Sequence, residues 1–99
     1  MTKATQLRKL VNDSGIIVLP GAHDVLSAKL IEQAGFSVVF TSGFGLSASV
    51  LGVPDIGLLT ATESLDSVRR IAGATTVPVV ADMDTGYGNP LNVVRTVQE

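Results

Sequence analysis

The chain has 99 residues, of which 45% are apolar and 16% charged, and its formal net charge is -2, a composition typical of one core-forming domain rather than a disordered segment. It lacks the basic excess that nucleic acid or an anionic membrane surface requires, and it has no cysteine for a disulfide, a metal site or a nucleophile. The polar first residues and the lack of an apolar run of about 20 residues argue against a signal peptide and a membrane span, so we expect a cytoplasmic protein.

The first part of the chain predicts two helices with a strand between them. Residues 3–12 carry apolar side chains at helical spacing, which indicates an amphipathic helix. The apolar run 16–19 is typical of a buried strand, and a Pro-Gly pair ends it. Asp24 can cap a helix that runs to about Ala34 and is followed by a glycine. The expected inner face of that helix consists of Val25, Leu26, Leu30 and Ile31.

The second part continues the alternation of strands and helices. Residues 36–41 predict a second strand, and the small residues after it, 46–55, predict an irregular connection. The remaining predicted elements are a helix from Thr60 or Thr62 to about Gly73, a strand over 77–81 and a helix that begins at Pro90.

The order of these elements, one helix and then three strand–helix units, predicts an α/β fold. Strands that are unbroken apolar runs, joined by helices, imply a parallel sheet covered on at least one face. An open sheet and the first part of a (β/α)8 barrel, which needs about 250 residues, both fit this order. The mean hydropathy of +0.42 favours the barrel, because a lone small sheet does not supply so much burial. We therefore expect residues 1–99 to be the N-terminal portion of a single barrel domain.

Two acids stand at the carboxyl end of the third predicted strand, Asp82 and Asp84. Residues i and i+2 of an extended strand point to the same side, so both carboxylates would face one space. Two such charges stay ionised when a cation lies beside them, and a hard ion such as Mg²⁺ takes oxygen ligands of this kind. The alternative is that Asp84 starts a turn while Asp82 accepts bonds from nearby backbone amides.

Polar and glycine-rich residues follow the other two strands as well. Ser42 lies among glycines whose backbone amides could bind a carboxylate or a phosphate, although a flexible turn explains the same pattern. His23 could act as an acid or base or could be a solvated capping residue. Asp55 is either a second acid near the metal or a turn residue, and Tyr87 either lines the pocket or covers it.

The same loops carry a resemblance to a known enzyme family. The stretches are SGFGLSASVLGVPDIGLLT at 42–60, VPVVADMDTGYGNPLNVVRTV at 77–97 and PGAHDVLSAKLIEQAGF at 20–36. They resemble the isocitrate lyase / phosphoenolpyruvate mutase superfamily, in particular the branch of phosphonomutases, 2-methylisocitrate lyase and oxaloacetate decarboxylase. The similarity extends over nearly all of residues 7–99.

The resemblance implies a (β/α)8 barrel, a Mg²⁺ cofactor and chemistry through an enolpyruvate-like intermediate. It would make Asp82 the direct metal ligand, beside the substrate, and Asp84 a second acid of the metal site. Asp84 and Asp55 would hold water molecules on the metal and take part in catalysis. A cation beside the oxygen of an enolate stabilises negative charge where it develops.

The resemblance also implies a site for a small carboxylate substrate. Ser42, Gly43 and Phe44 would bind the carboxylate through hydroxyl and backbone N–H donors, and Phe40 would lie beside the substrate. It further implies a homo-oligomer, a tetramer in the family, for the full-length enzyme.

Departures from the family pattern keep two classes of function open. Met83 replaces the usual Ala or Gly between the two acids, and Phe44 stands where the lyases commonly have Gly. We expect two further parts of the family pattern beyond residue 99. One is the K-[KR]-C-G-H gating loop, whose cysteine serves as the acid in the lyases, and the other is the remaining five strand–helix units. The sequence thus predicts part of a Mg²⁺-dependent lyase or, alternatively, of a phosphonomutase. The other class is a truncated fragment that is not catalytic, and we expect the 99 residues alone to be inactive.

Overall fold

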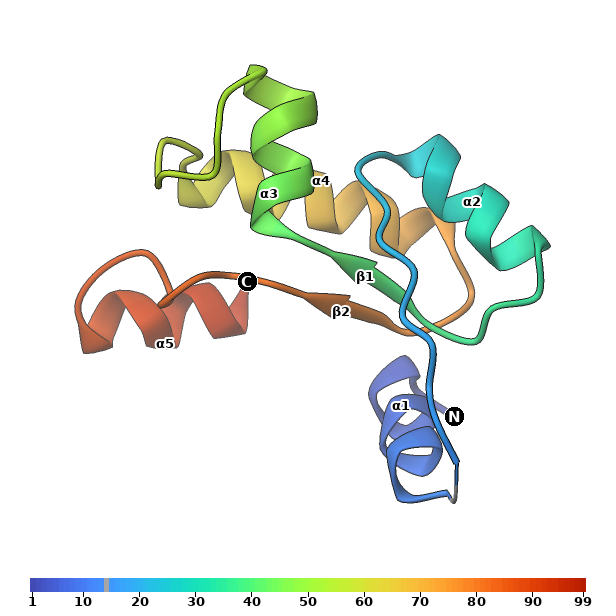
Figure 1. Ribbon diagram of the computed structural model, residues 1–99. Coiled ribbons are helices and arrows are strands. Elements are labelled where there is room, and N and C mark those ends of the chain that lie inside the picture. Colours follow the sequence, from blue (N-terminus) through green and yellow to red (C-terminus); the bar gives the residue numbers. More distant parts are fainter. Residues whose placement is uncertain (14) are drawn as a thin grey trace.

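The computed structural model describes residues 1–13 and 15–99, and it is an α/β structure in which helices surround a small parallel sheet (Figure 1). Its elements are α1 (Lys3–Asn12), α2 (Val25–Gln33), β1 (Val39–Thr41), α3 (Gly43–Leu46), the π-helical segment η1 (Ser47–Leu51), α4 (Ala61–Ala74), β2 (Val79–Ala81) and α5 (Pro90–Gln98). The four long predicted helices are confirmed, and so are the second and third predicted strands, although both strands are shorter than expected. Within the described residues, no helix is long and apolar enough to cross a membrane.

The sheet has two strands, and they are parallel as predicted. β1 pairs with β2 so that Val39 faces Val79 and Thr41 faces Ala81. A single bridge joins Gly21 to Phe40 on the other edge of β1, also in the parallel sense. Since parallel strands end on the same side of a sheet, the segments after Thr41 and after Ala81 leave it together.

Side-chain caps fix where three of the helices begin. Asp24, Thr60 and Asn89 each accept a hydrogen bond from the backbone of the first turn, and a side chain three residues later bonds back to the capping residue. This reciprocal pattern satisfies amide groups that a helix start otherwise leaves unpaired. At the other end of α2, Gly35 adopts a φ of 96°, a left-handed conformation that a glycine reaches without steric cost.

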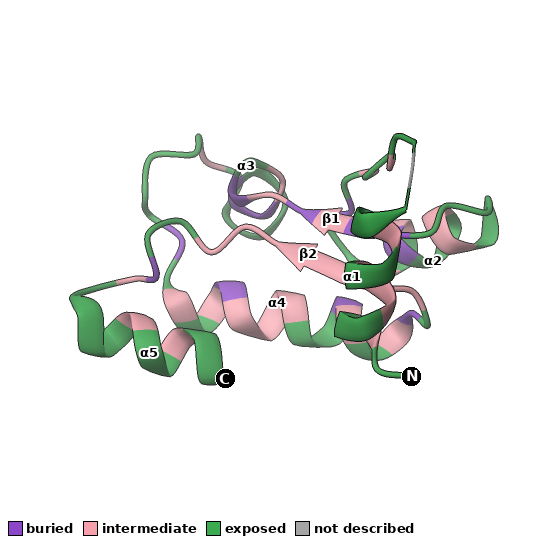
Figure 2. Cartoon of the chain, turned by 90° about the horizontal axis from the view of Figure 1, so that it is seen from below, coloured by how far each residue is buried: buried purple, intermediate pink, exposed green. Residues whose placement is uncertain are grey.

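The core lies between the sheet and the two helices α2 and α4. Ala28 of α2, Val39 of β1 and Ile71 of α4 are buried in one cluster. Figure 2 shows α4 running along the sheet, with buried positions on the side that faces the strands, whereas α1 and α5 are mostly exposed. The Glu32 carboxylate at the end of α2 accepts bonds from the backbone amides of Thr76, at 2.7 Å, and of Val77, at 3.2 Å, and so ties α2 to the start of β2.

Three expectations about the fold are wrong. Residues 16–19 form no strand, and Ile16 is 94% exposed, because within the described chain no strand pairs with them. Leu26 and Leu30 of α2 are also exposed, since Ala28, with Val25 and Ile31 packed beside it, occupies the face that meets the core. Of the segment 46–55, which was expected to be irregular, residues 46–51 are helical, with Leu46 and Ser47 buried, whereas residues 52–55 are irregular as expected.

Candidate functional site

The carboxyl ends of β1 and β2 bring two of the predicted functional segments together. The backbone amide of Asp82 donates to the carbonyl of Thr41 at 2.9 Å, which extends the pairing of the strands by one step. β1 then leads into Ser42 and α3, and β2 leads into the acidic loop 82–88. The predicted convergence of the loops after these strands is therefore present in the structure.

The Asp82 carboxylate is held by two backbone amides. Its Oδ2 accepts a long bond of 3.4 Å from the amide of Gly43, and its Oδ1 accepts a bond of 3.0 Å from the amide of Asp84. Asp84 adopts a φ of 50°, so the extended geometry that would have aimed both acids into one space ends before it. The turn-and-amide arrangement weighed as the alternative is thus present around Asp82. Two amide donors leave further lone pairs of the carboxylate free for another ligand.

A second carboxylate, that of Asp55, reaches the same place from the loop after η1. A β-carbon placed on Gly43 would lie 3.5 Å from Asp55 Oδ1 and 3.6 Å from Asp82 Oδ2. The two carboxylates therefore approach the α-carbon of Gly43 together, and the absent side chain leaves the space between them open. Of the three predicted acids, Asp55 and Asp82 are the pair that meets across Gly43, while Asp84 contacts Asp82 through its backbone.

These acids have no basic partner among residues 1–13 and 15–99. The ion pairs of the described chain lie elsewhere and join His23 to Asp24, Arg70 to Asp66, and Arg95 to Glu99. Three or more metal-binding side chains do not come together within the same residues. Mg²⁺ nevertheless needs only one or two carboxylates and completes its shell with water, so the hard oxygen donors at Gly43 suit this ion.

The predicted substrate-binding residues surround the end of β1. Ser42 Oγ accepts a bond of 2.9 Å from the amide of Gly45 and caps α3, and its own proton remains free to be donated. Phe44 is 66% exposed, and Phe40, in the middle of β1, is half-buried. His23 is an exposed residue 3.5 Å from Asp24, which fits a solvated residue at the start of α2 rather than a member of this site.

Two side chains near the acids are less evident from the sequence. Burial is the main cause that raises the pKa of Tyr87, the Ser64 hydroxyl lowers it, and the negative charges of the three acids add to the rise. Tyr87 therefore lies within the electrostatic field of Asp84, Asp82 and Asp55. Ser64 is fully buried, and the one sequence feature that distinguishes it is a polar residue on the inner side of an amphipathic helix.

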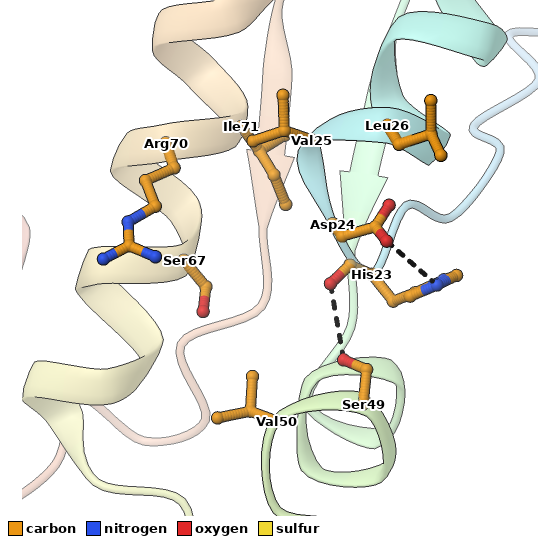
Figure 3. Close-up of a pocket in the computed structure, with 9 residues that line it drawn as sticks. All are labelled: His23, Asp24, Val25, Leu26, Ser49, Val50, Ser67, Arg70 and Ile71. Atoms are coloured by element: carbon orange, nitrogen blue, oxygen red, sulfur yellow. Dashed lines mark hydrogen bonds and ion pairs between the residues drawn. The ribbon is translucent and has the colours of Figure 1, made fainter.

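A cavity of about 430 Å³ lies apart from these acids, between α2, η1 and α4 (Figure 3). Its walls are residues 23–26, Ser49 and Val50 of η1, and Ser67, Arg70 and Ile71 of α4. In Figure 3 the His23 ring lies next to the Asp24 carboxylate, and the Ser49 hydroxyl donates a hydrogen bond to the His23 carbonyl. None of the predicted catalytic or metal-binding residues lines this cavity.

Comparisons with known proteins identify the family. A family model described as phosphoenolpyruvate phosphomutase matches residues 7–99. The chain is 50% identical over 99 residues to 2,3-dimethylmalate lyase of Eubacterium barkeri, covering 100% of this chain and 34% of that protein. It is 48% identical over 96 residues to carboxyvinyl-carboxyphosphonate phosphorylmutase, chloroplastic, of Arabidopsis thaliana, covering 96% of this chain and 28% of that protein. A crystal structure of phosphonopyruvate hydrolase in complex with oxalate and Mg²⁺ matches with a TM-score of 0.92 at 43% identity, covering 98% of this chain and 34% of that one.

The chain spans about a third of the length of these relatives. The match nevertheless includes both strand ends and all three acids, since it extends from residue 7 to residue 99. The chain therefore belongs to the phosphoenolpyruvate phosphomutase family, within the phosphoenolpyruvate mutase/isocitrate lyase superfamily of enzymes.

Proposed function

We propose that this chain is the N-terminal part of a Mg²⁺-dependent lyase that cleaves a carbon–carbon bond of a small 2-oxo or 2-hydroxy carboxylate through an enolpyruvate-like intermediate. The observation that carries the proposal is the pair of carboxylates of Asp55 and Asp82, which both lie beside Gly43 and have no basic partner within the described residues. A relative that binds oxalate and Mg²⁺ supports it. Oxalate has a carboxylate next to a second anionic oxygen, as the enolate of pyruvate does.

The acids would hold the metal, and the residues after β1 would hold the substrate. Asp82 is the direct metal ligand, while Asp55 and Asp84 orient the water around the ion. Mg²⁺, when bound, supplies positive charge beside the oxygen on which the enolate charge develops. Ser42 donates its free hydroxyl proton to the substrate carboxylate and thereby orients the bond to be cleaved.

Aromatic side chains complete the proposed substrate site. Phe40, between the buried neighbours Val39 and Thr41, lies beside the substrate, and Phe44, together with the backbone of Gly43, borders the carboxylate end. Exclusion of water by such side chains strengthens each electrostatic contact inside a site.

The proposal extends to the whole protein. Residues 1–99 are the first part of a (β/α)8 barrel, because a parallel sheet with helices on its face is the unit from which that barrel is built. The exposed side chains of residues 16–19 then pack against further strands of the barrel. The enzyme is a cytoplasmic homo-oligomer.

A phosphonomutase is the second candidate function. It is favoured by Phe44 at a position where the lyases commonly have Gly, and by similarity to a phosphorylmutase. The coding sequence beyond residue 99 separates the two candidates. A K-[KR]-C-G-H string about 20 to 30 residues further on indicates a lyase, and a longer polar loop indicates a mutase. The non-catalytic alternative is that the natural protein is a truncated fragment of such an enzyme.

The experiment is an NMR assay of the product of the complete coding sequence with Mg²⁺ and a panel of 2-hydroxy carboxylates, 2-oxo carboxylates and phosphonopyruvate. Release of a 2-oxo acid by carbon–carbon cleavage is expected, with turnover about 100-fold lower in Asp82→Asn. Asp66→Asn is the matched control, because that carboxylate pairs with Arg70 on the surface of α4. Equal turnover in Asp82→Asn and the wild type contradicts the proposal.

A further inference from the structure

Ser64 is a fully buried serine of α4 whose hydroxyl is directed at the acidic loop 82–88. Its Oγ donates to the thioether sulfur of Met83 at 3.7 Å, and the Ser64 hydroxyl lowers the pKa of the Tyr87 phenol. A serine inside a helix commonly bonds to a carbonyl of the preceding turn or points to solvent. The Ser64 hydroxyl instead links α4 to the Met83 side chain of the loop.

The loop needs such support because two of its residues have unusual backbone conformations. Asp84 adopts a φ of 50° and Tyr87 a φ of 62°, both left-handed. Such a conformation is unfavourable for a residue other than glycine and persists only where neighbouring structure holds it. Part of that support is the hydrogen bond from the amide of Gly86 to the carbonyl of Met83 at 2.9 Å, and part is the bond from the Thr96 hydroxyl to Gly86 at 2.8 Å.

Met83 connects this support to the acids. It stands between Asp82 and Asp84, and its side chain is half-buried against α4. Where the Met83 side chain is fixed, the direction in which the chain leaves β2 is fixed as well. That direction sets whether the Asp84 amide reaches Asp82 Oδ1, now at 3.0 Å, and whether Asp82 Oδ2 stays near Gly43.

We infer that Ser64 is a positioning residue, which through Met83 holds the 82–88 loop so that the Asp82 carboxylate stays beside Gly43, next to Asp55. The inference rests on the proposed function in that the positioned carboxylate is the one proposed to bind the metal. According to this inference, α4 influences cation affinity at the strand ends through the 82–88 loop.

The test compares Ser64→Ala and Met83→Leu with Ser67→Ala in the product of the complete coding sequence. Met83→Leu keeps the volume of the side chain and removes the sulfur acceptor, so it tests the contact even where Ser64→Ala disturbs folding. Ser67→Ala is the matched control, because Ser67 lies one turn further along α4 and makes no side-chain hydrogen bond within the described residues. ¹H–¹⁵N spectra without metal follow the amides of Gly43 and Asp84, which both donate to Asp82.

Both amide signals are expected to move in Ser64→Ala and in Met83→Leu, and to stay in place in Ser67→Ala. Titration with Mg²⁺, followed by the same signals, is expected to give an affinity about tenfold lower in the first two variants. Unchanged amide signals in both variants overturn the inference, and so does wild-type Mg²⁺ affinity in variants whose signals have moved. Mg²⁺ binding that is equal in the wild type and in Asp82→Asn overturns the proposed metal site instead, while the metal-free spectra still decide whether Ser64 holds the loop.

Discussion

A methyl group placed between the two carboxylates should block the proposed cation site without harming the fold. Gly43→Ala supplies that methyl group, at 3.5 Å from Asp55 Oδ1 and 3.6 Å from Asp82 Oδ2. These are ordinary van der Waals distances, so the substitution causes no clash in the metal-free protein. Gly43 is the first residue of the short helix α3, where alanine is favoured over glycine by up to about 0.5–1 kcal/mol. We therefore expect the thermal unfolding midpoint to stay unchanged or to rise.

Binding of the cation should respond in the opposite direction. Asp82, the proposed direct ligand, has to lie about 2.0–2.1 Å from Mg²⁺, and Asp55 has to reach a water molecule on the ion. The ion and its water therefore need the space that the methyl group now fills. We expect at least a tenfold loss of affinity, which is about 1.4 kcal/mol. Mn²⁺ is a suitable probe, because it takes the same hard oxygen ligands and broadens NMR signals of nearby amides.

The matched control for this variant is Gly73→Ala. Gly73 lies near the end of α4, and a β-carbon there would meet nothing within 4 Å. This variant should gain helix stability of the same order while Mn²⁺ broadens the amide signals of Gly43 and Asp84 as in the wild type. If Gly43→Ala also binds Mn²⁺ with wild-type affinity, the space between Asp55 and Asp82 is not the cation site, and the reasoning from the glycine is refuted.

Three further predictions concern stability and pH. Thr41→Val should stabilise the chain by about 1 kcal/mol and raise the unfolding midpoint by about 4–8 °C, because the buried Thr41 hydroxyl has no hydrogen-bond partner among residues 1–13 and 15–99. Thr75→Val is the contrasting variant, since it removes a bond to the Ile71 carbonyl and should destabilise the chain. A loss of stability in both variants contradicts the first expectation. Hydrogen bonds from Thr76 lower the pKa of Glu32 below its usual value near 4.5, so the contribution of Glu32 to stability is present above that pH and is lost as the pH falls further. Urea unfolding at a series of pH values should show that Glu32→Gln loses less stability in acid than the wild type. An identical loss of stability would exclude the hydrogen bonds that join α2 to the segment before β2. Burial raises the pKa of Tyr87, the only tyrosine in a chain without tryptophan, so the absorbance of its phenolate should develop above the usual value of 10. Stability should fall as the pH rises through the higher folded-state pKa. A titration midpoint of the absorbance at or below pH 10 would place the ring in solvent.

Besides the two short strands, the elements that were predicted correctly are helices, and the starts of helices are specified by nearby residues. The helices after Asp24 and Thr60 and the helix that begins at Pro90 start at capping residues, and capping depends on contacts within one turn. The strand predicted over 16–19 depends on pairing with segments distant in the sequence. The apolar pattern of residues 16–19 indicates that they can be buried, but it does not indicate which element covers them. Ile16 is exposed in this structure.

The site divides in the same way. The position of Asp82 beside the loop after β1 follows from parallel strands ending on one side of a sheet, and its bond from Gly43 confirms it. The arrival of Asp55 depends on the helical path of η1, which small residues did not predict. The contact between Ser64 and Met83 joins positions 19 residues apart, and neither spacing nor composition indicates such a pair.

Acidic side chains on the helix surfaces are paired with arginine, whereas those at the strand ends are not, and this difference bears on function. On the helix surfaces, Asp66 pairs with Arg70 at 2.8 Å and Glu99 pairs with Arg95 at 2.9 Å. At the strand ends the structure brings Asp55 and Asp82 together across a glycine with no basic side chain paired to either, within residues 1–13 and 15–99. The oxygen atoms of these two carboxylates are the hard ligands that Mg²⁺ takes in proteins, and they approach a position that glycine leaves empty. The left-handed backbone at Asp84 and Tyr87 in the same loop is the strain expected where geometry serves binding rather than stability.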